Sequence, residues 1–81
     1  MPMVIAYVLI NCDLGSEEQI IGELKHISDV KEAHGTFGAY DIITKVESDQ
    51  ISTLRETMMS KIRKIRHVRS TLTLMGIEDQ G

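Results

Sequence analysis

One apolar stretch near the start of the chain constrains the fold more than any other feature. Residues 3–11 (MVIAYVLIN) place aliphatic side chains at both even and odd positions, between Pro2 and the turn-forming residues 13–15. A strand that is apolar on both faces is buried on both sides. We therefore expect residues 3–11 to form a central strand of a sheet.

Two amphipathic helices are predicted downstream. Residues 16–19 (SEEQ) match a capping box, with Ser16 as N-cap and Gln19 at the third helical position, which predicts a helix over 16–27. Ser48-Asp49 is predicted to cap a second helix. Apolar residues at helical spacing mark one face of that helix: Ile51, Leu54, Met58, Ile62 and Ile65.

Three further strands complete an alternating series. Residues 30–36 form a polar strand suited to a sheet edge, and a glycine-containing loop joins it as a hairpin to a strand over 41–46. Residues 68–77 form the last strand, and 78–81 are a polar tail. The order β-α-β-β-α-β predicts a single α+β domain over 1–81, in the split βαβ arrangement. Right-handed crossovers place both helices on one face of a four-stranded antiparallel sheet with strand order 4-1-3-2.

The other face of this sheet has nothing in the chain to cover it. With 81 residues and a single cysteine, the chain has a small core and no intrachain disulfide to support it. The uncovered face carries half of the apolar side chains of the first strand, with Leu74 or Met75 from the fourth. An exposed apolar patch of this kind marks an interaction surface. The simplest partner is a second copy placed sheet to sheet.

Composition excludes several classes of protein. The net charge of −3 argues against a general nucleic-acid binder, and no apolar run approaches the roughly 20 residues of a membrane span. The start, residues 1–3, lacks the features of a signal peptide, so a cytoplasmic location is expected. Five of the nine Lys and Arg residues lie in 61–69, which we interpret as a dipole-matched helix end and solvated turn rather than a phosphate site.

No catalytic or metal-binding group stands out. Cys12 and the three histidines lack the spacing of a zinc site, and none forms a recognisable catalytic pair with a carboxylate in sequence. Cys12 is interpreted as a small core or strand-end residue. We predict no metal, no cofactor and no enzymatic activity.

The hairpin connection at residues 36–41 is the best candidate for binding. Gly38 meets the structural need for a positive φ angle, and Asp41 opens a strand, where aspartate is uncommon. Backbone amides near Gly38 could hold a carboxylate while Asp41 holds an ammonium group, a combination that selects α-amino acids. The alternative is that Asp41 caps the turn.

Thr71 and Thr73 share one face of the fourth strand. Threonine is common in strands, so ordinary strand filling is the simpler interpretation. Alternatively, the two hydroxyls line a small polar pocket at a sheet-to-sheet interface.

These segments together resemble the C-terminal effector domain of Lrp/AsnC-type (feast/famine) regulators over about residues 3–76. The resemblance is carried by Gly38-x-Tyr40-Asp41, by Val68-Arg69-x-Thr71-x-Thr73 and by the strand 6–11. It implies a ferredoxin-like fold, a sheet-to-sheet dimer, assembly into rings of eight or ten chains, and an amino-acid effector bound between subunits. The implied ligand residues are Gly38, Ala39, Tyr40, Asp41, Thr71 and Thr73. Phe37 departs from the small or polar residue usual before the glycine.

The full-length regulators carry an N-terminal helix-turn-helix domain, and here the first strand already begins near residue 3. The chain thus resembles stand-alone effector domains, which imply action with Lrp-like DNA-binding relatives or separate amino-acid sensing, without direct nucleic-acid contact. Two alternatives remain open: a small dimeric ferredoxin-like enzyme of the monooxygenase or isomerase type, and a ligand-free assembly module. A regulatory module of the ACT type also shares this layout.

Overall fold

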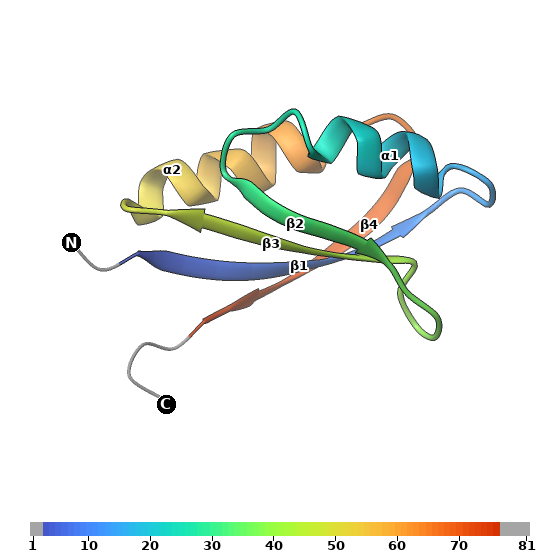
Figure 1. Cartoon of the computed structure of the whole chain (residues 1–81), viewed down its shortest axis with the longest axis horizontal. Helices are drawn as coiled ribbons and strands as arrows, with labels where there is room; N and C mark the ends of the chain where they lie inside the picture. The colour runs from blue at the N-terminus through green and yellow to red at the C-terminus, as the bar shows by residue number, and fades with distance from the viewer. Residues whose placement is uncertain (1–2, 77–81) are drawn as a thin grey trace.

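Two helices lie on one face of a four-stranded antiparallel sheet in the computed structural model, which describes residues 3–76 (Figure 1). The strands follow the order β2-β3-β1-β4. Their bounds are Val4–Cys12 for β1, Val30–Gly35 for β2, Ile42–Ser48 for β3 and Val68–Met75 for β4. This is the predicted ferredoxin-like α+β fold with its predicted strand order. Ile77 of the predicted fourth strand and the predicted tail lie outside the described residues.

The core lies between the sheet and the helices. In the central strand β1, the side chains of Ala6, Val8 and Ile10 are fully buried, whereas that of Tyr7 is exposed. This alternation follows from the two-residue period of a strand. The helices add Ile20, Leu24, Leu54 and Ile62 to the same buried cluster.

Helix α1 spans Glu17–Leu24 and is shorter than the predicted 16–27. Its buried residues are Ile20 and Leu24. Beyond Leu24 the amides of His26 and Ile27 donate to carbonyls three residues earlier, so the chain tightens out of the α-helix. Ser16 occupies the N-cap position but makes no side-chain cap hydrogen bond, so the capping box does not form.

The second helix differs more from its prediction. Helix α2 spans Ile51–Glu56 and continues as a π-helical segment, η1, over Thr57–Ile62. Within it the amide of Arg63 donates to the carbonyl of Met58, five residues earlier. The N-cap is Gln50 rather than Ser48-Asp49, because the Ser48 hydroxyl instead accepts a hydrogen bond from the Gln50 amide before the helix begins.

The apolar face of this second helix also starts later than predicted. Ile51 is exposed, whereas Leu54 and Ile62 are fully buried, with Thr57 buried between them. The hydroxyl of Thr57 donates to Asp29 Oδ2 at 2.8 Å, which satisfies this buried polar group. No helix within residues 3–76 is long and apolar enough to cross a membrane.

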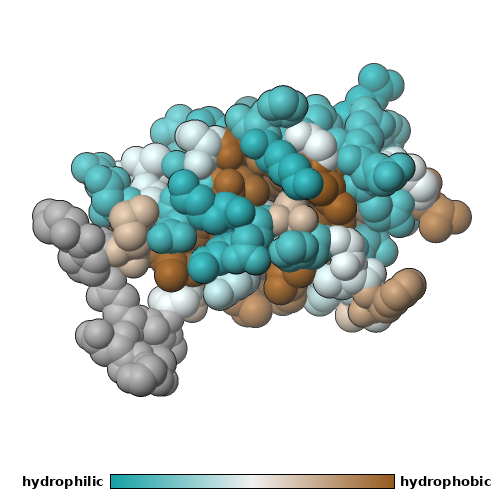
Figure 2. Space-filling model, viewed as in Figure 1, coloured by the Kyte–Doolittle hydropathy of each residue, from teal (hydrophilic) through white to brown (hydrophobic). Residues whose placement is uncertain are grey.

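The helix-free side of the sheet carries apolar side chains from three adjacent strands. Strand pairing aligns Leu9 with Ile43 and Leu72, and Tyr7 with Leu74. We call this set the open face: Ile5, Tyr7, Leu9, Ile43, Leu72 and Leu74. Apolar surface reaches the edge of the molecule on the sheet side, beneath the helices (Figure 2). Met75 pairs with Ala6 and lies on the helix side, so of the two predicted residues Leu74 is the one on the open face.

Candidate functional site

The β2–β3 connection forms a closed loop that projects beyond the end of the sheet (Figure 1). Gly38 has φ of +118°, the conformation for which a glycine was predicted. The Thr36 hydroxyl donates to the carbonyl of Tyr40, and the Thr36 amide donates to that of Asp41, both at 2.8 Å. These two bonds fix the base of the loop. Phe37 is fully exposed at its tip, so in one chain its ring does not cover the neighbouring residues.

Asp41 ties this loop to the end of the central strand. Its amide donates to the carbonyl of Ile10, and its carboxylate Oδ2 accepts a hydrogen bond from the amide of Cys12, each at 2.9 Å. The carboxylate therefore has a structural role within the chain, but it bonds to the end of β1 rather than capping its own turn. A carboxylate has two oxygens and about four acceptor positions, so this one bond leaves capacity for a ligand donor.

Asp41 also lines a surface hollow of about 420 Å³ at this end of the sheet. The other lining residues are Asn11 and Cys12 from β1, and Arg69 and Ser70 from β4. The hollow thus presents a carboxylate, a guanidinium, an amide and a hydroxyl within one small volume. This donor and acceptor set suits a small polar molecule carrying both charges.

An irregularity in the β1–β4 pairing explains how Arg69 reaches the hollow. Asn11 pairs with Ser70, but Cys12 pairs with Val68, so Arg69 is an extra residue without a partner in the ladder. A β-bulge of this kind redirects a side chain and is common beside binding sites. The turn before β4 has an uncommon backbone conformation, since His67 has φ of +76°, a value seldom adopted by residues other than glycine.

A second carboxylate stabilises this corner. Asp13 Oδ2 lies 3.1 Å from His67 Nδ1, and Asp13 Oδ1 lies 3.8 Å from Arg69 Nε. The amide of Asp13 donates to the carbonyl of His67 at 2.9 Å. The residues after β1 are therefore joined to the residues before β4 by both backbone and side chains.

The thiol of Cys12 is buried and lies near several carboxylates. Burial raises the pKa of Cys12, and the carboxylates of Asp41, Glu17 and Asp13 raise it further. A thiol nucleophile needs a lowered pKa, so this environment keeps Cys12 protonated and unreactive. The structure supports its interpretation as a core residue.

Thr71 and Thr73 do not join this hollow. They pair with Ile10 and Val8, whose side chains are buried against the helices, so both threonines lie on the helix side of the sheet. Within one chain they therefore lie on the side of the sheet opposite the open face, and their role as ligand residues stays a prediction.

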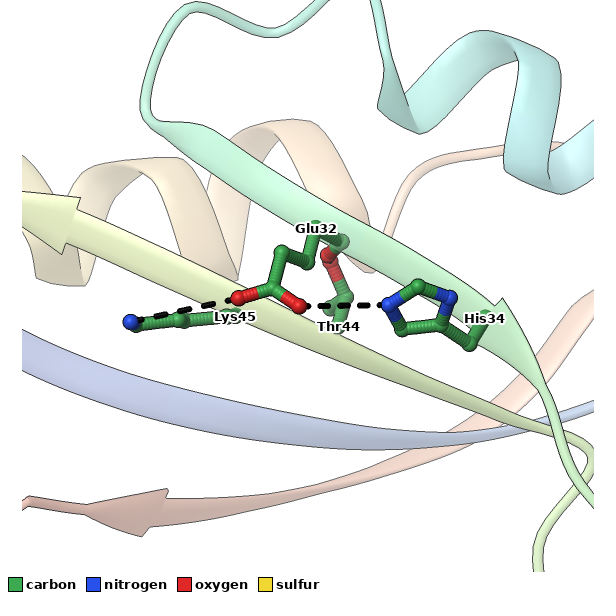
Figure 3. Close-up of polar contacts among 4 residues, drawn as sticks. All are labelled: Glu32, His34, Thr44 and Lys45. Carbon is green, nitrogen blue, oxygen red and sulfur yellow. Dashed lines mark hydrogen bonds and ion pairs between the residues drawn. The ribbon is translucent and has the colours of Figure 1, made fainter.

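A polar cluster borders the open face on the other edge of the sheet (Figure 3). Glu32 Oε1 lies 3.2 Å from His34 Nε2, and Glu32 Oε2 lies 3.9 Å from Lys45 Nζ. The hydroxyl of Thr44 donates to the Glu32 carbonyl at 2.7 Å. Glu32 pairs with Lys45 and His34 with Ile43, so this cluster gives the open face a charged rim. Polar rims around apolar centres are typical of protein–protein interfaces.

Four lining residues escaped prediction as binding residues. Of the predicted set only Asp41 lines the hollow directly, and the other lining residues are Asn11, Cys12, Arg69 and Ser70. Arg69 was assigned to the solvated basic segment, although it also belongs to the Val68-Arg69-x-Thr71 motif. That motif is the signal that could have identified it.

The fold and this end of the sheet thus define a compact α+β domain with a mixed-charge surface hollow. A family model described as the Lrp/AsnC ligand binding domain matches residues 5–79. The chain belongs to this family, as the resemblance predicted.

Individual relatives agree with this assignment. The chain is 34% identical over 62 residues to the regulatory protein AsnC of Haemophilus influenzae, a match that covers 76% of this chain and 41% of that protein. The structure of FFRP-DM1 is 35% identical with a TM-score of 0.87, and the match covers 91% of this chain and 99% of that one. A Neisseria meningitidis transcriptional regulator, solved as a complex with L-Met, shares the fold at 8% identity and a TM-score of 0.84, covering 96% of this chain and 52% of that one.

Proposed function

We propose that this chain is an amino-acid-sensing and oligomerisation module that modulates Lrp/AsnC-type transcription regulators. The observation that carries the proposal is the hollow beside the Gly38 loop, in which Asp41 and Arg69 offer opposite charges. A free α-amino acid carries an ammonium and a carboxylate on one carbon, and so pairs with both. Membership of a ligand-binding family and the L-Met complex of the Neisseria relative support this ligand class.

The proposed binding residues are those of the loop and its base. Asp41 holds the ligand ammonium, while Gly38, Ala39 and Tyr40 contribute backbone groups from the exposed loop. Thr71 and Thr73 remain predictions carried by the family resemblance. Both lie on the helix side of the edge strand β4, and their contact with a ligand is proposed at an interface between subunits.

The proposed assembly follows from the open face. Leu72 and Leu74 are 43% and 49% exposed, and they lie beside Tyr7 on the same side of the sheet. We propose that a second copy covers this patch sheet to sheet, with the Glu32 cluster at its rim. Assembly of such dimers into rings of eight or ten chains is the form expected from the resemblance.

Regulation is proposed to occur through binding rather than catalysis. The chain spans 41% of the length of the H. influenzae regulator it matches. The proposed protein partners are Lrp-like DNA-binding relatives, as the family resemblance implies. Its own net charge of −3 suits contact with protein and small ligand rather than with nucleic acid.

Calorimetric titration with each of the twenty amino acids tests the sensing function. At least one amino acid is expected to bind, and Asp41→Ala is expected to abolish that binding. Absence of binding to all twenty, with the assembly intact, would remove the sensing function. Equal binding by the Asp41→Ala variant would remove the role assigned to Asp41.

A further inference from the structure

We infer that Arg69 determines the specificity of the hollow by pairing with the ligand carboxylate, and that Asp13 positions Arg69 for this task. The inference rests on the proposed function and deepens it. Arg69 thereby joins the proposed binding residues, although the sequence predicts it in a solvated basic turn.

Arg69 lies outside the regular pairing of β1 with β4. It is the extra residue of the bulge between the Asn11–Ser70 and Cys12–Val68 pairs. Its side chain is therefore not committed to either face by regular pairing, and it lines the hollow together with Asp41. Bulges that redirect a side chain are typically retained for a function at that point.

The Asp13 carboxylate contacts the Arg69 guanidinium. Arg69 Nε lies 3.8 Å from Asp13 Oδ1, longer than a hydrogen bond, so the contact orients the guanidinium without saturating its donors. Asp13 is itself held through its amide and through His67. Among residues 3–76 no other acidic side chain forms an ion pair with Arg69.

The lining of the hollow contains one charge of each sign. Arg69 and Asp41 supply one positive and one negative group, and the Asn11 amide and Ser70 hydroxyl supply neutral donors and acceptors. A zwitterion satisfies both charges. A simple amine leaves Arg69 without a partner, and a simple carboxylate places its charge near Asp41. Guanidinium groups favour carboxylates because their donors match the two oxygens.

The test is calorimetric titration of the full chain with its best-binding amino acid and with the amide of the same amino acid, which lacks the carboxylate. Arg69→Gln is expected to weaken binding of the amino acid by about 10- to 100-fold, the range for a hydrogen-bonded charge pair. Binding of the amide is expected to change little. Arg66→Gln, which removes an exposed basic side chain three residues away, is the matched control and is expected to bind like the wild type.

Asp13 is tested by replacement and rescue. Asp13→Ala is expected to reduce the preference for the amino acid over its amide, and Asp13→Glu is expected to restore part of it. A purely structural role for Asp13 would instead weaken both ligands equally and leave their ratio unchanged.

The outcomes separate this inference from the proposed function. If the wild type binds an amino acid and Arg69→Gln binds it equally well, the role of Arg69 is overturned while amino-acid sensing stands. An equal loss of amino acid and amide in Arg69→Gln also overturns that role. If the wild type binds none of the twenty amino acids, the sensing function itself fails.

Discussion

The carboxylate of Asp41 accepts the amide hydrogen of Cys12 at 2.9 Å, and this bond fastens the start of β3 to the end of β1. Twenty-nine residues separate the two in sequence. The same carboxylate lines the hollow, so one side chain serves both the stability of the sheet end and the proposed recognition of an ammonium group.

Replacement of Asp41 is therefore expected to lower stability as well as binding. Asp41→Ala leaves the partly buried Cys12 amide without its acceptor and should reduce the free energy of unfolding by about 1–3 kcal/mol. Asp41→Asn keeps an acceptor and should cost less. Urea unfolding at a fixed protein concentration measures both values. Asp49→Ala, at an exposed position, is the control, and equal stability of Asp41→Ala and Asp49→Ala would contradict the structural role of the Asp41–Cys12 bond.

A second polar contact stabilises the π-helical segment. Thr57 is buried, and its hydroxyl donates to Asp29 Oδ2 at 2.8 Å, which connects η1 to the turn before β2. Thr57→Val removes this bond to a charged acceptor and should lower the free energy of unfolding by about 1.5–3 kcal/mol. Thr53→Val changes the same atoms at an exposed position of α2 and should stay within about 0.5 kcal/mol of the wild type. Thermal or urea unfolding compares the pair, and equal stability of the two variants would contradict the assignment.

Charge on the open face is expected to break the proposed assembly without unfolding the chain. Leu74→Glu places a carboxylate beside Tyr7 on the face that a second copy would cover, where burial of an unpaired charge is costly. Sedimentation velocity should show a smaller species, with an unchanged circular dichroism spectrum. Leu14→Glu is the matched control, because Leu14 is 99% exposed in the loop after β1. An unchanged mass for Leu74→Glu would rule out this face as the interface.

Because the pKa of Cys12 is raised in the folded chain, the free energy of unfolding is expected to decrease at alkaline pH. Burial and the nearby carboxylates favour the protonated thiol in the folded chain. Once the pH exceeds the ordinary pKa of a thiol, the unfolded chain loses its proton first, so it binds fewer protons than the folded chain and stability falls as pH rises. Urea unfolding across this range should show the decline, and Cys12→Ala should reduce its slope. A slope unaffected by Cys12→Ala would contradict the effect.

The order of strands was predictable because it rests on residue patterns within single segments. An apolar first strand and a polar second strand determine which is central and which lies at the edge. The hollow was not predictable in the same way, because it depends on pairing between β1 and β4. Val68 and Ser70 would share a face in a regular strand, yet the bulge at Arg69 pairs Val68 with buried Cys12 and Ser70 with Asn11. The π-helical segment likewise contacts a residue distant in sequence, through the bond from Thr57 to Asp29.

Sedimentation equilibrium of the full chain, alone and with each of the twenty amino acids, tests the central claim most directly because it reports assembly and ligand response together. The account predicts a dimer or larger assembly whose distribution changes with at least one amino acid. A monomer under all conditions, unaffected by any amino acid, would contradict it.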